Sequence, residues 1–138
     1  MVTISFSQNG STPFQQLLGH HKGILEKWIL LEDYFFSSKT FSPELKEEVR
    51  RTLAYQNGCE YCMAKGAPSK NKMDSRTQLA VYAAELSDKK THLSDAECSA
   101  LKEVFTESEI SELLAFICFI TACQRFGALM NLGPSCRI

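Results

Sequence analysis

The sequence predicts a single all-α domain, and three observations support this prediction. Helix-start signals recur along the chain, apolar residues repeat at three- and four-residue steps, and no run alternates over the length of a strand. A chain of 138 residues is also one domain by length and is large enough to bury a core of its own. We therefore expect one domain over residues 1–138, with about six helices joined by short loops and a loose segment at residues 1–12.

Four of these helices have recognisable beginnings. In each, a Ser, Thr or Asp side chain can accept a hydrogen bond from a backbone N–H group of the first turn, and acidic residues in that turn suit the positive end of the helix dipole. The beginnings are Ser42 followed by Pro43 and Glu44, Asp74 before a run of good helix formers, and two capping boxes, Ser94 with Glu97 and Thr106 with Glu109.

Apolar spacing indicates which faces the helices bury. A further helix is expected within residues 17–36, ahead of the first capped one. The predicted inward stripes are Ile24, Trp28 and Leu31 in that helix, Leu45, Val49 and Leu53 in the next, and Leu79, Tyr82, Ala83 and Leu86 in the one after.

The last helix, over about residues 107–131, is apolar almost all round in its middle. A helix of this kind is buried on every side, and a short chain has limited capacity to bury one by itself. We therefore expect neighbouring subunits to cover part of it. Its apolar run at residues 113–123 is too short to span a bilayer, which needs about 20 residues, so no membrane partner is expected.

Charge and composition argue against several classes of partner. The net charge is −1 with acidic and basic residues interleaved, so no basic stripe indicates binding to nucleic acid or to an anionic membrane. The Lys-Asn-Lys run at residues 70–72 is interpreted as a short solvated loop. The first ten residues lack the basic start and apolar run of a signal peptide, so we expect a soluble, cytoplasmic protein.

The chain has six cysteines, which is many for its length. A disulfide framework is not expected, because such frameworks belong to small secreted domains. Cys118 and Cys123 lie in the apolar run and are interpreted as small hydrophobic residues of the core. Cys98 and Cys136 stand singly.

The stretch NGCEYC at residues 57–62 is the most specific motif, and it has three interpretations. A C-x-x-C pair that opens a helix suits redox chemistry, because free backbone N–H groups stabilise the thiolate of the first cysteine, Cys59, and the second thiol lies one turn away. A zinc site needs four ligands, and no second C-x-x-C completes one, so no metal is expected. Two unreactive thiols are the third interpretation. Redox chemistry is preferred.

The motif and its surroundings resemble the family of AhpD-like alkylhydroperoxidases and carboxymuconolactone decarboxylases. Glu47 stands twelve positions before Cys59, as an acidic residue does in that family. The helical segments at residues 17–35 and 105–130 are similar to its first and last helices, with Gln124-Arg125 where an Asn-Arg pair is common. The resemblance covers roughly residues 15–133.

The resemblance implies an AhpD-like helical bundle that assembles as a trimer or hexamer, and a reaction without a cofactor. The active members reduce hydroperoxides and form a disulfide, while a glutamate and a histidine relay the proton. Carried over by position, Cys62 attacks the peroxide, Cys59 resolves the resulting sulfenic acid, and Glu47 is the relay carboxylate. An unidentified thiol or lipoyl compound would be the reductant.

Two positions depart from the family pattern. The family histidine, four residues after the second cysteine, is replaced by Gly66, so the usual base is missing and activity should be weak. A histidine introduced at position 66 is expected to raise activity near pH 7, provided that its ring can reach Cys62. Arg51, four residues after Glu47, favours an ion pair that keeps Glu47 ionised. The auxiliary candidates are His20, His21, Tyr61 or a water as base, and Lys65 as a cation that stabilises a thiolate.

The sequence therefore predicts a thiol-dependent hydroperoxide or disulfide reductase that acts in antioxidant defence. Two alternatives stay open. One is a non-catalytic, redox-responsive oligomer on the same scaffold. The other is a decarboxylase of a lactone acid, although the decarboxylase members of the family lack the cysteine pair that this chain has.

Overall fold

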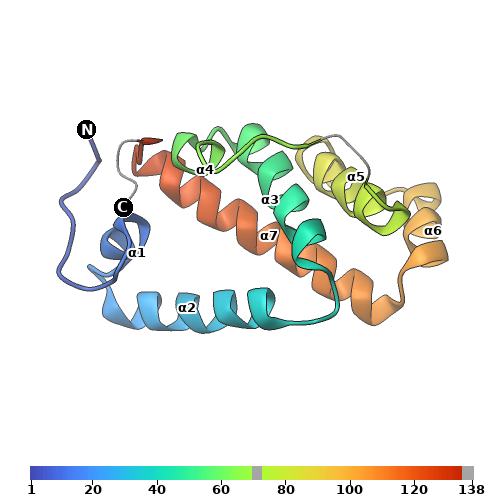
Figure 1. The fold of residues 1–138 in the computed structure, drawn as a ribbon, viewed down its shortest axis with the longest axis horizontal. Helices are drawn as coiled ribbons and strands as arrows, with labels where there is room; N and C mark the ends of the chain where they lie inside the picture. Colours follow the sequence, from blue (N-terminus) through green and yellow to red (C-terminus); the bar gives the residue numbers. More distant parts are fainter. Residues whose placement is uncertain (70–72, 135–138) are drawn as a thin grey trace.

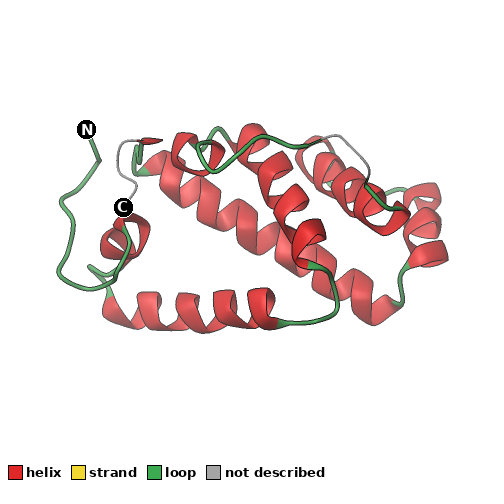
Figure 2. Ribbon diagram, viewed as in Figure 1, coloured by secondary structure: helices red, strands yellow, loops and turns green. Residues whose placement is uncertain are grey.

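The computed structural model describes residues 1–69 and 73–134, and all regular structure in this part of the chain is helical (Figure 1, Figure 2). The all-α prediction is confirmed. The helices are α1 (Pro13–Leu18), α2 (Lys22–Ser37), α3 (Pro43–Asn57), α4 (Glu60–Met63), α5 (Ser75–Lys89), α6 (Asp95–Val104) and α7 (Glu107–Leu129). The predicted solvated loop at residues 70–72 and Cys136 lie outside the described residues.

Helix α7 is the central element of the fold, and the other helices are arranged around it (Figure 1). Helix α3 packs against both α5 and α7, and α6 packs against the beginning of α7. Helix α2 runs along the opposite side of α7 from α3, and α1 lies near the C-terminal end of α7. The short α4 contacts α3 and α7, so the cysteine motif sits between these two helices.

The predicted helix beginnings are confirmed. Each capping side chain accepts a hydrogen bond from the third backbone N–H group of its helix, and both predicted capping boxes close in both directions. These signals are local, because the cap and the N–H group that it binds are three residues apart. The capping residues are Ser42 of α3, Asp74 of α5, Ser94 of α6 and Thr106 of α7.

The main core lies between α3, α5 and α7. The predicted stripe of α3 is confirmed, because Leu45, Val49 and Leu53 are all buried. The prediction for α5 is partly wrong: Ala83 and Leu86 are buried as predicted, but Tyr82 is 42% exposed, and Ala80 and Ala84 are buried in its place. Small residues let α5 lie close to α3, so the helix turns its alanine face inward and leaves the large tyrosine outside.

Helix α2 is rotated relative to the predicted face. Ile24 and Leu31 are exposed, whereas Leu25 and Phe35 are buried and Trp28 is partly buried. The reason is aromatic packing on α7. The ring centroids of Trp28 and Phe119 are 5.6 Å apart, and those of Phe35 and Phe119 are 5.3 Å apart. Such pairs stabilise helix contacts beyond the area that they bury.

The segment at residues 1–12, predicted to be loose, forms no helix or strand. Hydrogen bonds nevertheless connect it to two helices. The Thr3 backbone N–H donates to the Met130 carbonyl at 2.9 Å, just after α7, and the Ser7 backbone N–H donates to the Gln16 carbonyl of α1 at 3.1 Å. The segment therefore joins α1 to the end of α7.

Among the described residues, one helix is long and apolar enough by length and composition to cross a membrane. It is α7, whose 23 residues contain the apolar run at 113–123. The core helix of a soluble protein passes the same test, and α7 packs against α3, α4, α5 and α6.

Candidate functional site

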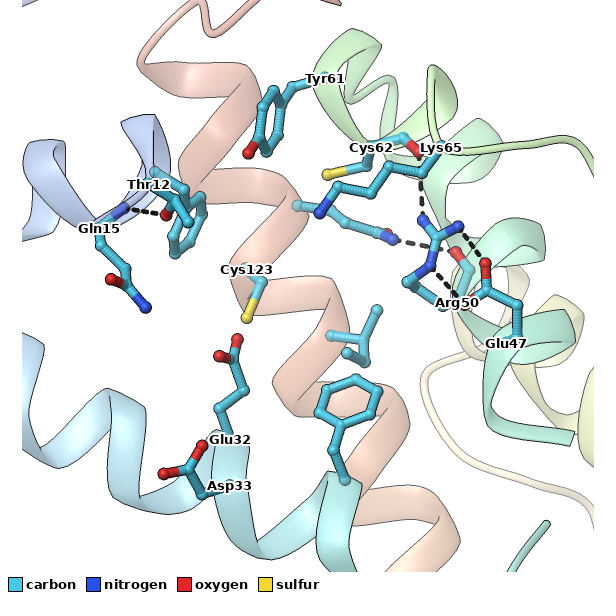
Figure 3. A pocket seen from close by; sticks show the side chains of 14 residues that line it. Thr12, Gln15, Glu32, Asp33, Glu47, Arg50, Tyr61, Cys62, Lys65 and Cys123 are labelled. Atoms are coloured by element: carbon cyan, nitrogen blue, oxygen red, sulfur yellow. Dashed lines mark hydrogen bonds and ion pairs between the residues drawn. The ribbon is translucent and has the colours of Figure 1, made fainter. Parts of the chain in front are cut away.

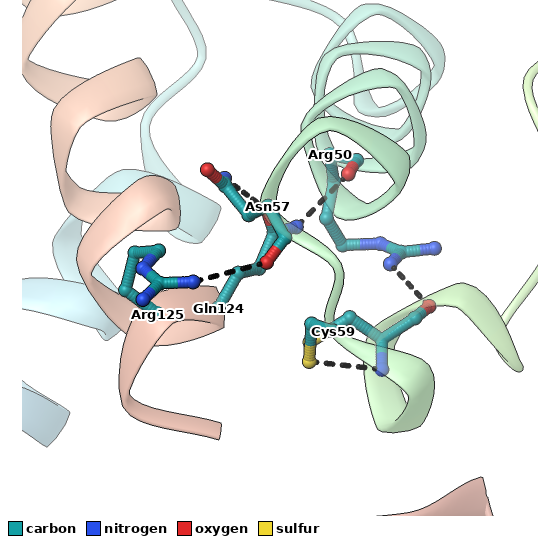
Figure 4. Close-up of a disulfide and its surroundings, with 6 residues drawn as sticks. Arg50, Asn57, Cys59, Gln124 and Arg125 are labelled. Atoms are coloured by element: carbon teal, nitrogen blue, oxygen red, sulfur yellow. Dashed lines mark hydrogen bonds between the residues drawn. A yellow bond between two sulfur atoms is a disulfide. The ribbon is translucent and has the colours of Figure 1, made fainter. Parts of the chain in front are cut away.

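The cysteine pair lies at a sharp corner between α3 and α4. Gly58 ends α3 in the left-handed conformation, with φ of 65°, which a glycine adopts without a steric cost. Cys59 follows as the N-cap of α4, and its Sγ accepts a hydrogen bond from the Cys62 backbone N–H at 3.2 Å. The two cysteines form a disulfide, with their Cα atoms 5.2 Å apart (Figure 4).

The two sulfur atoms differ in accessibility. Cys59 is 0% exposed and packs beside Gly127 of α7, where an added Cβ would lie 3.2 Å from the Cys59 Sγ. Cys62 is 9% exposed and lines the cavity described next. A molecule in that cavity therefore meets Cys62 first, which favours Cys62 over Cys59 as the attacking thiol.

A cavity of about 520 Å³ is lined by residues of α1, α2, α3, α4 and α7 (Figure 3). It has the size of a small-molecule site, with apolar walls and a few charged groups. The apolar walls come from Phe14, Phe36, Tyr61 and Ile120. The charged side chains at its surface are Glu32, Asp33, Glu47, Arg50 and Lys65, and its two sulfur-bearing residues are Cys62 and Cys123.

Glu47 lines this cavity but is held by two arginines of its own helix. Arg50 donates to both carboxylate oxygens, from Nε at 3.0 Å and from Nη2 at 2.7 Å, and Arg51 donates from Nε at 3.0 Å. The predicted ion pair with Arg51 is confirmed. The Arg50 hydrogen bond, followed by the charge of both arginines, holds the pKa of Glu47 below its ordinary value. A carboxylate in this state is a poor proton acceptor near neutral pH.

Arg50 was not predicted as a site residue, although it contacts the motif directly. Its Nη1 donates to the Cys62 carbonyl at 3.1 Å, so the guanidinium lies close to the cysteine pair. Its own carbonyl accepts from Gln124 Nε2 at 3.0 Å, and Gln124 in turn accepts from Asn57 at 2.8 Å (Figure 4). The three-residue spacing from Glu47 is a local signal that could have identified Arg50.

The backbone at position 66 differs from what was expected. Helix α4 ends at Met63, so residue 66 is not one helical turn beyond Cys62. Gly66 also has a φ of 133°, and a Cβ placed there would lie 3.1 Å from the Arg51 Cζ. A histidine at position 66 would therefore strain the backbone and push against Arg51, and its effect on activity stays a prediction.

The four auxiliary candidates fall into two groups. Tyr61 and Lys65 line the cavity, with the Lys65 Nζ 4.9 Å from the centroid of the Tyr61 ring. His20 and His21 do not line it. The His20 ring contacts the Ser5 carbonyl, and His21 Nδ1 caps α2 by accepting from the Ile24 backbone N–H at 3.2 Å.

Cys123 and Cys118 occupy different environments, although they are five residues apart on α7. Cys123 is partly buried, accepts a hydrogen bond from Trp28 Nε1 at 3.2 Å, and has its pKa raised to about 12, mainly by burial. Cys118 is exposed, so the prediction that it is a core residue is wrong.

Glu32 is a further cavity residue that was not predicted. It projects from α2 beside Cys123 (Figure 3), and its pKa is raised, first by burial and then by the charge of Asp33. It was missed because α2 was predicted to bury a different face. On the observed face, Glu32 stands between Trp28 and Phe35 at helical spacing, and an acid inside an apolar stripe is the signal that could have found it.

In the part of the chain that the structure describes, no group of three or more His, Cys, Asp and Glu side chains could hold a metal ion. Comparison of the chain with family models, with curated proteins and with solved structures finds no match. The cavity and the cysteine pair are therefore the features of the chain that point to a function.

Proposed function

We propose that the protein is a thiol-dependent reductase of hydroperoxides or disulfides, with Cys62 and Cys59 as its working pair. The observation that supports this most is the position of the pair. The two cysteines are close enough to form a disulfide, and Cys62 alone of the two lines a cavity of small-molecule size. A redox pair needs both features, since one sulfur meets the substrate and the other resolves the product.

With a hydroperoxide ROOH, the reaction has two steps. The Cys62 thiolate attacks the outer oxygen, the O–O bond breaks, and ROH leaves after taking up a proton, while Cys62 becomes a sulfenic acid. Cys59 then attacks the Cys62 sulfur, water leaves, and the disulfide forms. A thiol reductant returns the pair to the dithiol state by two exchange steps.

In this proposal Arg50 and Glu47 support the thiolate rather than relay its proton. The Arg50 guanidinium is bound to the Cys62 carbonyl, and a positive charge at this position favours the ionised sulfur. Glu47 orients that guanidinium through its two hydrogen bonds from Arg50. Glu47 is thus a positioning residue.

The proposal also extends to the scaffold and its assembly. We infer an AhpD-like bundle that forms a homo-oligomer, a trimer or a hexamer, in the cytoplasm. The support for assembly is the apolar outer surface of α2 together with the end of α7. The large apolar side chains exposed there are Ile24, Leu30, Leu31, Tyr34 and Leu129.

The test is to treat the reduced protein with one equivalent of tert-butyl hydroperoxide and to map the cysteines by mass spectrometry. The wild type should form the Cys59–Cys62 disulfide. Cys62→Ser should abolish peroxide consumption, because it removes the attacking sulfur, and Cys59→Ser should accumulate a sulfenic acid on Cys62 that a dione reagent traps. Cys98→Ser, outside the cavity, is the matched control. Unmodified Cys59 and Cys62 in the folded, treated wild type would contradict the proposal and favour a non-catalytic role.

A further inference from the structure

We propose that Glu32 is the general acid of this cavity and protonates the leaving group when Cys62 attacks. This inference rests on the proposed function and adds to it the proton donor that the cysteine motif lacks. When the O–O bond of an alkyl hydroperoxide breaks, the leaving alkoxide is a strong base, so a donor positioned next to it accelerates the step.

The position of Glu32 suits this role. Cys62 enters the cavity from α4, whereas Glu32 enters it from α2 and extends toward Cys123 on α7 (Figure 3). In a displacement at oxygen, the leaving atom departs on the side opposite to the attacking sulfur. A hydroperoxide attacked by Cys62 therefore directs its leaving oxygen away from α4, toward the wall that α2 and α7 form.

The state of the Glu32 carboxyl group also suits a donor. Its side chain is partly buried, and no hydrogen bond or ion pair to residues 1–69 or 73–134 holds its carboxylate. Burial and the neighbouring Asp33 raise its pKa, while the charge of Lys65 acts in the opposite sense. Glu32 therefore keeps its proton to higher pH than an ordinary glutamate does.

The other acids of the cavity are less suitable donors. Glu47 is held ionised by its two arginines, and Asp33 is exposed to solvent. The Cys123 thiol, with its pKa raised to about 12, gives up its proton far less readily than a carboxylic acid. Lys65 carries a proton and lines the same cavity, so it is the residue against which Glu32 has to be tested.

In this step the Cys62 thiolate donates an electron pair to the outer oxygen and forms an S–O bond, while the O–O bond breaks and its electron pair leaves with the alkoxide. The sulfur is thereby oxidised by two electrons, and the peroxide is reduced by two. The leaving alkoxide takes the proton of Glu32 and departs as an alcohol. The Glu32 carboxylate is then protonated again from solvent, which has received the proton that Cys62 released when it ionised.

The experiment compares two oxidants in a single turnover of the reduced protein, with disulfide formation measured by acid quench and mass spectrometry. The leaving group of tert-butyl hydroperoxide is a strongly basic alkoxide, whereas that of peracetic acid is acetate, which departs without a proton. Glu32→Gln should slow the reaction with tert-butyl hydroperoxide by about 10²-fold or more and leave the reaction with peracetic acid unchanged. Glu26→Gln, the same substitution at an exposed residue of α2 that does not line the cavity, should change neither rate.

Three results would overturn the proposal. In the first, Glu32→Gln lowers the rates with both oxidants by the same factor, which indicates a role in positioning or charge alone. In the second, Glu32→Gln lowers neither rate. In the third, Lys65→Gln is the variant that lowers only the rate with tert-butyl hydroperoxide, which makes Lys65 the donor. A wild type that forms no disulfide with either oxidant would instead remove the proposed function itself, so the two failures are distinguishable.

The wild type supplies a second readout that does not depend on a folded variant. A general acid makes the rate less sensitive to leaving-group basicity. The ratio of the peracetic acid rate to the tert-butyl hydroperoxide rate should therefore be smaller for the protein than for the thiolate of free cysteine at the same pH. An equal ratio would overturn the assignment of a general acid.

Discussion

At the scale of single residues, Arg50 links the cysteine pair to both long helices of the core. Its guanidinium binds Glu47 and the Cys62 carbonyl, and its backbone carbonyl accepts from Gln124 of α7. Gln124 is 1% exposed, and its amide is satisfied by this contact and by the one from Asn57. A buried polar network whose members all have partners fixes the relative position of α3, α4 and α7.

The charge of Glu47 should contribute a pH-dependent part of the stability. Its pKa is lowered in the folded protein, so its contribution is complete above its unfolded pKa and is lost as the pH falls through the folded one. Glu47→Gln should lower the free energy of unfolding at pH 7 by less than about 1 kcal/mol, since the side chain is 39% exposed. The difference should shrink as the pH falls through the lowered pKa of folded Glu47. Urea denaturation at pH 7 and over a series of acidic pH values measures it, and a difference that does not shrink in acid would contradict the charge-based explanation.

Glycine should be needed at position 66 because of the backbone conformation there, and not because of a role in the reaction. An alanine there has to adopt a φ of 133° and contact the Arg51 guanidinium, so Gly66→Ala should lower the free energy of unfolding by on the order of 1–3 kcal/mol. The matched variant is Gly58→Ala, where φ is 65° and no atom lies within 4 Å of the new Cβ. It should cost on the order of 1 kcal/mol. Equal costs for the two variants would show that the Arg51 contact relaxes without strain.

At the scale of helices, the beginning of α7 should have a measurable effect on stability. Thr106 accepts from the Glu109 backbone N–H at 3.1 Å, and the Glu109 side chain accepts from the Thr106 N–H at 2.9 Å. Thr106→Ala removes the capping oxygen and should lower the free energy of unfolding by about 1 kcal/mol. Thr106→Ser keeps a capping oxygen and should retain most of that stabilisation. Thermal or urea unfolding measures both, and equal losses for Ala and Ser would indicate that the methyl group matters and the cap does not.

The helices also show why sequence predicts some elements better than others. The cap of α7 and the stripe of α3 were predicted correctly, because each depends on residues within a few positions of one another. The inward face of α2 was not, because it depends on where the rings of Trp28 and Phe35 meet Phe119, a residue more than eighty positions away. Pattern alone offered several apolar faces on α2, and tertiary packing selected one of them.

The residues of the candidate site show the same difference between local signals and tertiary packing. The cysteine pair and the Glu47–Arg51 ion pair were predictable, because C-x-x-C spacing and four-residue helical spacing are local rules. Glu32 was not, because it reaches the cavity only through the orientation of α2. The backbone at position 66 was misjudged because a family pattern places a side chain there without regard to the backbone conformation of this chain.

At the scale of the whole molecule, the outer surface of α2 exposes several large apolar side chains. Monomeric proteins rarely expose a large contiguous apolar patch to water. Leu30 is 64% exposed and Tyr34, one turn further, is 63% exposed. We predict that sedimentation velocity shows a trimer or a multiple of it, and that Leu30→Glu with Tyr34→Glu dissociates it, because two charges would then be buried without partners.

Lys22→Glu is the control for this prediction, because it reverses an exposed charge at the first turn of the same helix. It should leave the assembly intact. A wild type that stays monomeric at micromolar concentration would contradict the assembly, and an oligomer that survives the double substitution would place the interface elsewhere.

Trp28 is the single tryptophan of the chain, and its indole N–H donates to the Cys123 sulfur, which lines the cavity opposite Cys62. A thiol in contact with an excited indole quenches its emission. The protein therefore contains its own optical reporter, without any added dye. A molecule that enters the cavity and displaces or shields Cys123 should change the intensity of the intrinsic fluorescence, so ligands for this cavity can be ranked by titration of the unmodified chain.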